Sequence, residues 1–583
     1  GEIAQEGFKA AGDPKVFPEQ LKGGLEPWQP LAVYGMVPFA PINDKGMMFD
    51  YATGKWAPAQ FRNYVTGEIV KGTLSTDVTI PVGERDPRFG RSYTQIAREG
   101  WGEQKSQNGG ANPTLSGPGS AQYHLWAVAP AAQAGPGQVT AHDSLFLNSE
   151  VHIDTSLPGL ASQVGPNPPA WLPSALDQIE TSLRQFQQAL DGKPPEEAAR
   201  LLAPIYARAI ALRSRIASDA SLNLAAKATV LLEMDAKLHD FQCALKELLG
   251  LDLVAFRTHE TTVQNGGFRG SSADQTSAAV SPGDDFHVRI HIGGLSSEVH
   301  VEKTWFSGET SEPWQQGDAI SKSVVPPTWD GIFDLKVPSD APPTAPYFTR
   351  PSIEQPYYDI SNEAWRERSF APWPLSAWAE FSFQGTPIRI GEVVQTLQRA
   401  TGPGGFYEPL VVTPLIGVRI SPQAQILPLD GSPLPVTVTV HTQAPADGTI
   451  TLDLPPGWHS EPTEAAFHRT AAGDSEPLQF KVTPADHEGG QFTIQAEAHA
   501  GGKSYRSGWR SIGYEGLRPY NMFRAATLNT RRVNVKVVPG LRVGYVMGPG
   551  DLVPEAMEAM GIHPHLLSPE ELAGANLSQW NVI

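Results

Sequence analysis

The sequence predicts a multidomain protein in which two β-sandwich modules lie between helical and α/β segments. A chain of 583 residues is too long for one hydrophobic core. Its 56 glycines and 53 prolines, with only 18% charged residues, are typical of turn-rich β structure. The spacing of apolar residues is helical over 172–251, alternates beyond 255, and becomes a buried-strand run near Leu541.

The charge and the apolar pattern exclude several classes of partner. A formal net charge of −18 repels phosphate backbones and anionic lipid. We therefore expect no nucleic-acid partner and no membrane-surface partner. No apolar run approaches the roughly 18 residues of a membrane span. The single cysteine, Cys243, excludes intrachain disulfides and a cysteine-based zinc site.

The segment 1–164 is predicted to mix helices with short strands. Residues 1–11 have the pattern of a helix without an N-cap, and this predicts that the chain begins inside a folded α/β domain. Short strands are expected at Leu31–Val37 and Gly46–Tyr51. A second helix is expected from about Ser92 to Gln107.

The segment 165–254 is predicted to be a small helical hairpin or bundle. The Pro-rich stretch Gly165–Pro169 marks its start, and apolar residues then recur at spacings of three and four. A second helix opens at Pro194–Glu197, where proline and acidic residues suit a first turn. A third spans about Leu222–Leu249, and we expect Cys243 to lie in its packing face.

Two β-sandwich modules are predicted over 255–415 and 416–515. Phe286–Ile292 and Val436–Val440 alternate strictly between two faces, as half-buried strands do. In the second module we expect strands near 416–420, 435–442, 448–454, 477–483, 491–499 and 503–513. The segment 516–540 is predicted to be a linker.

The segment 541–583 is predicted to be the start of a parallel α/β domain. Leu541–Val546 has the composition of a buried strand, and Val553–Met560 that of an amphipathic helix. A second strand is expected at Ile562–Leu566 and a third at Trp580–Ile583. A parallel sheet needs several strands and two covered faces. We therefore expect the chain to stop inside this domain.

Motifs in the first 160 residues resemble the PIG-L (LmbE-like) family of zinc-dependent N-deacetylases, in its large multidomain bacterial form. The residues that carry the resemblance are Glu6–Pro14, Phe17–Gln20, Pro27–Gln29, Phe49–Trp56, and Asp86–Tyr93 followed by Gln104–Gln107. Two later segments agree with that layout. The 416–515 module resembles the sandwich that accompanies galactosidases and carbohydrate-binding modules, and 541–583 resembles the start of a class I glutamine amidotransferase.

The resemblance implies a metal-dependent hydrolase that removes acetyl from an N-acetylated amino sugar of the N-acetylglucosamine type, or from a related acetamide. The family's zinc ligands and its general-base Asp belong to motifs expected before Gly1. This chain is therefore expected to hold no catalytic residue and no metal, and to be inactive alone. Arg98 and Gln107 are the implied substrate-pocket contacts. Gln104 stands where smaller members often have His, and Gln107 matches.

For Arg98 and Gln107 the structural alternative is a helix C-terminal cation and a C-cap hydrogen bond. His287 and His291 share one strand face with Arg289 between them, which favours a solvated face over a metal site. His563 and His565 are interpreted in the same way. Gly548–Asp551 is predicted to be a structural turn with Asp551 as the helix N-cap.

Aromatic residues are dense in the first β module, and they allow a second hypothesis. They are Trp305, Trp329, Trp373, Trp378 and Tyr357–Tyr358. Aromatic rings stack on sugars, so these residues allow a carbohydrate platform, although in a sandwich such residues more often fill the core. The alternative function is therefore a carbohydrate-binding accessory protein with a degenerate deacetylase-like domain. The module style favours an exported protein.

Overall fold

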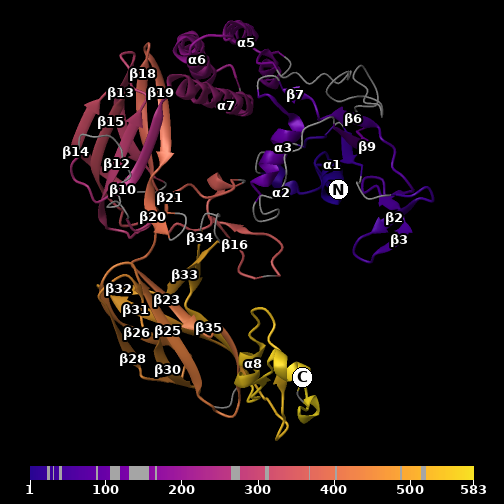
Figure 1. Cartoon of the computed structure of the whole chain (residues 1–583), viewed down its shortest axis with the longest axis vertical. Coiled ribbons are helices and arrows are strands. Elements are labelled where there is room, and N and C mark those ends of the chain that lie inside the picture. Colours follow the sequence, from indigo (N-terminus) through magenta and orange to yellow (C-terminus); the bar gives the residue numbers. More distant parts are fainter. Residues whose placement is uncertain are drawn as a thin grey trace. The chain divides into compact units, whose positions relative to one another are not determined.

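Antiparallel β-sheet is the main regular structure of this protein, with a few helices between the sheets (Figure 1). The computed structural model describes residues 1–22, 27–30, 32–37, 42–86, 89–104, 119–129, 156–164, 167–222, 224–263, 276–308, 314–352, 354–366, 368–400, 404–485, 489–513, 520–574 and 576–583. They divide into a first unit, Gly1–Leu160, and a second unit, Ala161–Ile583. None of the described helices is long and apolar enough to cross a membrane.

The first unit is organised around a small antiparallel sheet in the order β1-β9-β6. Its strands are β1 (Ala32–Met36), β6 (Val78–Pro81) and β9 (Ser120–Val128). The other elements are α1 (Glu2–Ala10), α2 (Pro18–Lys22), β2 (Met47–Asp50), β3 (Lys55–Pro58), β4 (Gln60–Arg62), β5 (Ile69–Lys71), β7 (Arg85–Asp86), β8 (Arg91–Ser92) and α3 (Tyr93–Gly102).

Polar side chains that bind the backbone hold this first unit together. The Gln5 side chain on α1 accepts a hydrogen bond from the Tyr64 amide at 2.7 Å. Asn63 donates from its side chain to the Trp126 carbonyl at 2.8 Å. Gln5 and Asn63 are both buried. The strands predicted at Leu31–Val37 and Gly46–Tyr51 are present as β1 and β2. Buried polar groups such as Gln5 and Asn63 give no hydrophobic periodicity, so the pattern of apolar residues could not predict these contacts.

Helix α3 ends earlier than its sequence predicts. Ser92 caps its start, with Ser92 and Gln95 forming a reciprocal capping box. The helix ends at Gly102, five residues before the predicted end at Gln107. Gly100 and Gly102 lie in its last turn, and glycine is the weakest helix former apart from proline.

The predicted helical segment is confirmed as α5 (Trp171–Ala189), α6 (Pro195–Ser218) and α7 (Leu224–Leu249), after a short 3₁₀ helix η2 (Pro158–Val164). The prediction for Cys243 is wrong, because its side chain is exposed. The buried face of α7 carries Phe241 and Leu245. Cys243 lies two residues from each, which turns it about 200° away from that face.

The first β module has two main sheets. One runs β14-β15-β12-β10-β20-β21 and the other β13-β18-β19. The strands are β10 (Asp252–Thr258), β12 (Asp285–Gly293), β13 (Val299–Ser307), β14 (Gln315–Val325), β15 (Thr328–Lys336), β18 (Ser376–Phe383), β19 (Thr386–Val393), β20 (Gln395–Ala400) and β21 (Gly404–Pro409). Two short strands, β11 (Ala279–Val280) and β22 (Val411–Val412), pair in parallel. The module begins at Asp252, inside the segment predicted to be helical.

Helix α7 covers the open edge of strand β19. The backbone N–H of Arg389 donates to the Gln242 side chain at 2.9 Å, and Lys246 pairs with Glu392 at 3.5 Å. Behind this contact, Tyr206 stacks on Phe241, and burial raises the pKa of Tyr206 to about 12. An uncovered edge strand invites pairing with another chain, so the helices protect the sheet.

The second β module pairs two sheets over one core. One sheet runs β23-β25-β30-β27 and the other β24-β35-β31-β26-β28. The strands are β23 (Ile416–Ser421), β24 (Ala424–Pro428), β25 (Leu434–Thr442), β26 (Ala446–Asp453), β27 (His459–Glu461), β28 (Glu464–Arg469), β29 (Gly473–Asp474), β30 (Leu478–Thr483), β31 (Gly490–Ala500), β32 (Lys503–Tyr505), β33 (Ser507–Ile512), β34 (Tyr520–Ala525) and β35 (Thr527–Val533). Val436, Val438 and Val440 all point into the core, as predicted.

The predicted linker over 516–540 is wrong for residues 520–533. Strand β35 lies inside a sheet, between β24 and β31. Its inward positions are Leu528, Thr530 and Arg532, all buried. Arg532 donates to the Ala485 carbonyl at 2.7 Å. Because two of the three inward residues are polar, the strand has no apolar alternation to reveal it.

The segment 541–583 confirms the predicted parallel pairing. Strands β36 (Gly544–Tyr545) and β37 (His565–Leu566) pair in parallel, with α8 (Val553–Ala559) between them in the chain. Val543 also forms a parallel bridge with Val582, after α9 (Pro569–Gly574) and η4 (Leu577–Gln579). The strands are shorter than predicted.

The predicted N-cap of α8 is also wrong, because Leu552 occupies that position. Asp551 closes the preceding turn instead, and accepts hydrogen bonds from the Gly548 amide at 2.9 Å and the Tyr545 hydroxyl at 3.0 Å. The turn at Gly548–Asp551 is therefore structural, as the sequence predicts.

The role of β35 in the core can be tested by cavity formation. Leu528→Ala removes a side chain with no exposed surface and should lower the stability of the second module by about 2–5 kcal/mol. Val538→Ala is the control, because that side chain is 68% exposed, and it should change stability by less than about 0.5 kcal/mol. Urea unfolding measures both. Equal effects would show that 520–533 is not part of the core.

Candidate functional site

Of the two substrate-pocket residues implied by the family resemblance, the structure describes only Arg98, so the distance between them is not defined. Arg98 lies half-buried on α3, one residue before the helix's last turn. Gln107 lies outside the described residues. The helix is held at its start by the Ser92 capping box and along its length by an ion pair between Arg91 and Glu99. The described residues thus fix the position of Arg98 within the unit but assign it no ligand.

The described residues do not fit a catalytic zinc. Among them, no group of three His, Cys, Asp or Glu side chains is close enough to hold a metal ion. Instead, histidines pair singly with carboxylates. His124 lies 2.8 Å from Asp77, and His565 lies 2.9 Å from Glu571. His563 has a separate partner in Glu558, so His563 and His565 do not share one ligand.

The strand face that carries His287, Arg289 and His291 is not the solvated surface that the sequence predicts. Arg289 is only 5% exposed and donates to Asp330 from two nitrogens, at 3.0 and 2.8 Å. A third nitrogen donates to Glu260 at 2.9 Å. Asp330 lies directly opposite His291 across the strands, and His291 Nδ1 is 3.1 Å from the same carboxylate oxygen.

This buried charge cluster is structural. Burial raises the pKa of Asp330, but hydrogen bonds from His291 and Arg289 outweigh burial and hold that pKa below its usual value. The two histidines have different carboxylate partners, since His287 pairs with Asp334 and His291 with Asp330. Through Glu260, the cluster anchors the segment after β10 to the sheet. The pattern of strand β12 alone could not identify Asp330 and Glu260 as the partners of Arg289.

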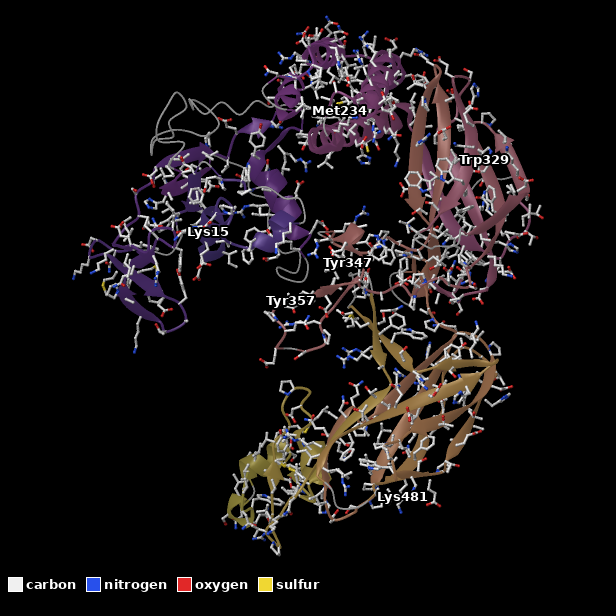
Figure 2. All side chains as sticks on the ribbon, turned by 180° about the vertical axis from the view of Figure 1, so that it is seen from behind. Lys15, Met234, Trp329, Tyr347, Tyr357 and Lys481 are labelled. Carbon is white, nitrogen blue, oxygen red and sulfur yellow. The ribbon has the colours of Figure 1, made fainter. Side chains whose placement is uncertain are left out.

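The structure separates the aromatic residues of the first module into core and surface groups. Trp329 is 5% exposed and stacks on Phe333, so it belongs to the core (Figure 2). Trp373 is half-buried and packs against Tyr520 at a ring-centroid distance of 5.9 Å. Tyr357 and Tyr358 are 65% and 54% exposed.

The exposed tyrosines lie on a long excursion between β15 and β18. It contains the short strands β16 (Phe348–Thr349) and β17 (Asp359–Ile360), and a 3₁₀ helix η3 (Glu363–Trp365). Figure 2 shows Tyr347 and Tyr357 on this segment. Edge-to-face contacts join Trp365 to Tyr347, Tyr347 to Phe348, and Phe348 to Tyr358. A continuous row of rings therefore leads from the inside of the excursion to its surface.

A cavity of about 230 Å³ opens at the inner end of this row. Tyr347 and Trp365 line it together with several prolines, and Thr344 and Ser361 add hydroxyl groups. The Tyr347 hydroxyl donates to the Arg368 carbonyl at 2.7 Å, which fixes its ring. Aromatic walls with a few hydroxyl groups are the general chemistry of a site for a neutral, polar ligand.

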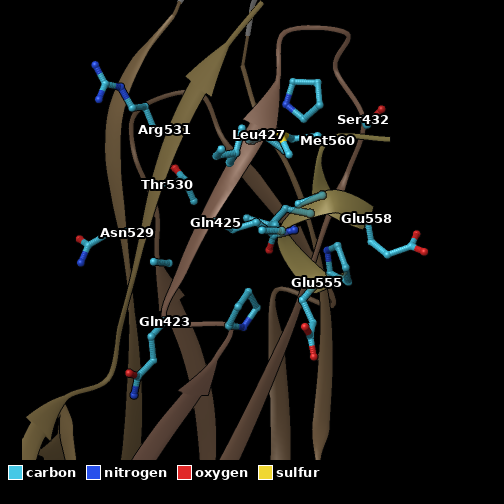
Figure 3. Close-up of a pocket in the computed structure, with 18 of the residues that line it drawn as sticks. Gln423, Gln425, Leu427, Ser432, Asn529, Thr530, Arg531, Glu555, Glu558 and Met560 are labelled. Atoms are coloured by element: carbon cyan, nitrogen blue, oxygen red, sulfur yellow. The ribbon is translucent and has the colours of Figure 1, made fainter. Parts of the chain in front are cut away.

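A larger groove, of about 1850 Å³, lies between β24, β35 and α8. Figure 3 shows Asn529, Thr530 and Arg531 on its strand side and Glu555 and Glu558 on its helix side. As far as the structure describes it, the lining contains neither histidine nor cysteine. Its lining carries serine and threonine hydroxyls and the carboxylates of Asp430, Glu555 and Glu558. No three potential metal ligands cluster among the described residues, and we assign no chemistry to the groove.

Comparisons with known proteins identify no family. No family model matches the chain, and no curated protein does. Among solved structures, part of the chain is similar to WR4, an MSP family member of C. elegans, with 7% identity over 20% of this chain and 97% of that chain, and a TM-score of 0.13. Another similar structure is the apo form of the Calx CBD1 domain, with 11% identity over 21% of this chain and 99% of that chain, and a TM-score of 0.14.

A third similar structure is a family 123 glycoside hydrolase from Clostridium perfringens, with 9% identity over 23% of this chain and 30% of that chain, and a TM-score of 0.12. At these values the likeness carries no argument about this chain. The fold itself shows the coarser class: a multidomain protein made mostly of β-sheet, with β-sandwich modules and several small helices.

The buried charge cluster predicts a specific pH dependence. Asp330→Asn removes the charge of the carboxylate that accepts two of the Arg289 hydrogen bonds and leaves Glu260 as the remaining carboxylate partner. It should destabilise the first module by about 3 kcal/mol at neutral pH. The lowered pKa of Asp330 means that its stabilising contribution is complete above the unfolded value of 3.8 and is lost as pH falls through the folded value. The difference between variant and wild type should therefore shrink at about pH 3.

Urea unfolding at the two pH values measures that difference. Asp334→Asn is the matched control, because its side chain lies on the same strand but is 58% exposed. A destabilisation by Asp330→Asn that stays the same at both pH values would contradict the assignment.

Proposed function

We propose that this chain belongs to a protein that removes acetyl from N-acetylated amino sugars, and that its first β module holds the glycan. The observation that carries the glycan-binding part is the row of rings from Trp365 to Tyr358. Tyr358 is exposed, and so is its neighbour in the sequence, Tyr357. Flat aromatic faces attract the C–H groups of sugar rings, while the nearby hydroxyl groups can bind sugar hydroxyls.

The deacetylase part of the proposal is supported by the ordered motifs of the first unit. Two of them, Phe49–Trp56 and Asp86–Tyr93, fall on the β2–β3 hairpin and on the β7–β8 hairpin that leads into α3. The motifs thus occur at turns and caps, where particular residue types are needed for backbone geometry. The zinc that such chemistry requires would be held by residues outside those described.

A second candidate function is glycan binding without deacetylation. The same exposed tyrosines favour it, because they need no metal. The two functions are separated by chemistry: only the first releases acetate.

The described residues predict the metal content of this chain. The zinc motifs of the family that this sequence resembles are not among the motifs that carry the resemblance, and no three potential ligands cluster among the described residues. The proposal therefore predicts that the purified chain retains no stoichiometric zinc after dialysis and releases no acetate from N-acetylglucosamine oligomers. Metal analysis and an acetate assay measure both. Stoichiometric zinc with turnover would overturn the prediction.

A protein in which this sequence is joined to a segment that carries the zinc ligands provides the positive test of the deacetylase proposal. It should release acetate from the same oligomers, and a zinc chelator should abolish the release. A joined protein that binds the oligomers but releases no acetate would leave only the second candidate function.

The exposed tyrosines predict where soluble oligomers bind. The double variant Tyr357→Ala/Tyr358→Ala should weaken binding of an N-acetylglucosamine oligomer roughly ten-fold, because two stacking faces are lost. Calorimetric titration measures the affinity. Tyr407→Ala is the control, since Tyr407 is 47% exposed on β21, outside the excursion, and its loss should leave affinity unchanged. Equal affinities for all three proteins would contradict the assignment.

A further inference from the structure

The sheet β13-β18-β19 presents an outer face that the core does not use. Side chains alternate along β18, and Ala377, Ala379 and Phe381 point inward with no exposed surface. Trp378 and Glu380 lie between them in the sequence and therefore point to the opposite face. Trp378 is half-buried on this outer face, while its neighbours in the strand pack into the core on the inner face.

The ring of Trp378 lies flat against the sheet. A side chain at Gly391, directly opposite on β19, would place its Cβ 2.5 Å from Cε3 of Trp378 and 2.6 Å from both Cδ2 and Cζ3. Near-equal distances to three successive ring atoms mean that Gly391 lies under the ring face and not at its edge. The indole nitrogen donates to the Ser307 hydroxyl at 2.9 Å, which fixes the ring's rotation.

Trp305 lies next to Trp378 on the neighbouring strand, with its ring nearly parallel to that of Trp378. Trp305 is directly opposite Trp378 in the β13–β18 pairing. The two ring planes differ by only 10°, and their centroids are 6.0 Å apart. Because the ring of Trp378 is parallel to the sheet, the ring of Trp305 is parallel to it as well. We call this pair of rings the tryptophan floor.

A row of charged side chains borders the tryptophan floor. Glu380 is paired with Lys303 at 3.6 Å and with Arg389 at 2.6 Å. The hydrogen bond from Arg389 lowers the pKa of Glu380, so this carboxylate remains ionised near neutral pH. The ammonium of Lys303 lies over the ring of Trp305, 5.1 Å from its centroid, so a sugar ring that stacks there takes the place of this ammonium. The row supplies both donors and acceptors beside two flat apolar faces.

We propose that the tryptophan floor binds an extended polysaccharide chain of N-acetylglucosamine units, with successive sugar rings lying on Trp305 and Trp378. This inference rests on the proposed function for the class of sugar. Two nearly parallel rings on a rigid sheet match a ligand whose own rings repeat along a line. The charged row then contacts the equatorial hydroxyl and acetamido groups at the edge of the sugar chain. The tryptophan floor lies on an open sheet face and can therefore bind a long polymer. The cavity of about 230 Å³ beside Tyr347 and Trp365 is too small for one.

Retention on an insoluble polymer of N-acetylglucosamine tests the floor. The full chain is sedimented with the polymer, and the bound fraction is measured for wild type, Trp305→Ala and Trp305→Ala/Trp378→Ala. The double variant should bind at least about ten-fold more weakly. Trp305→Ala leaves the contact between the ring of Trp378 and Gly391 intact, so the packing on this face of the sheet is kept. This single variant should show an intermediate loss, and circular dichroism should confirm that both variants are folded.

Trp509→Ala is the matched control. The ring of Trp509 lies over Gly417 on the outer face of the second module, in the same arrangement of tryptophan over glycine, but without a parallel second tryptophan. Its loss should leave retention unchanged. Wild-type retention by folded Trp305→Ala/Trp378→Ala overturns this inference alone if Tyr357→Ala/Tyr358→Ala still weakens soluble binding. A wild-type chain that binds neither the polymer nor the soluble oligomer overturns the proposed function and this inference together.

Discussion

Alternation of side chains along paired strands determines both the core and the surfaces of the two β modules. In β18 every second residue is fully buried, which leaves Trp378 and Glu380 on the other face with neighbours from β13 and β19. The same constraint places Arg289 on the face of β12 that points away from the core, where its side chain reaches Asp330 on the neighbouring strand β15. Glycine at positions such as Gly391 then lets a large ring lie against the sheet.

This constraint also explains how much the sequence could predict. Apolar periodicity located the helices of 172–249, the valine-rich strand β25 and the parallel pairing of β36 and β37, because each has one continuous apolar face. It missed β35, whose inward residues are mostly polar, and it misplaced Cys243, whose orientation depends on which face of α7 is buried. A pattern within one segment cannot identify partners from another.

The candidate sites show the same division. Composition identified the aromatic-rich module, but only the fold separates Trp329 in the core from Tyr357 at the surface. The sequence predicts that Arg289 is solvated, but in the structure it is buried and forms hydrogen bonds with Asp330 and Glu260. For the first unit, Arg98 is placed on α3 while Gln107 lies outside the described residues. The proposed glycan surfaces therefore rest on geometry, and the proposed deacetylase on the order of sequence motifs.

Hydrogen exchange of the full chain, with and without a soluble N-acetylglucosamine oligomer, tests the central claim most directly. The account predicts protection in the excursion between β15 and β18, which carries Tyr357 and Tyr358, and in β13 and β18 when the oligomer is long enough to span both tryptophans. Peptides of the second module and of 541–583 should exchange at the same rate in both states. Protection confined to the groove between β24, β35 and α8, with none in the first module, would contradict the account.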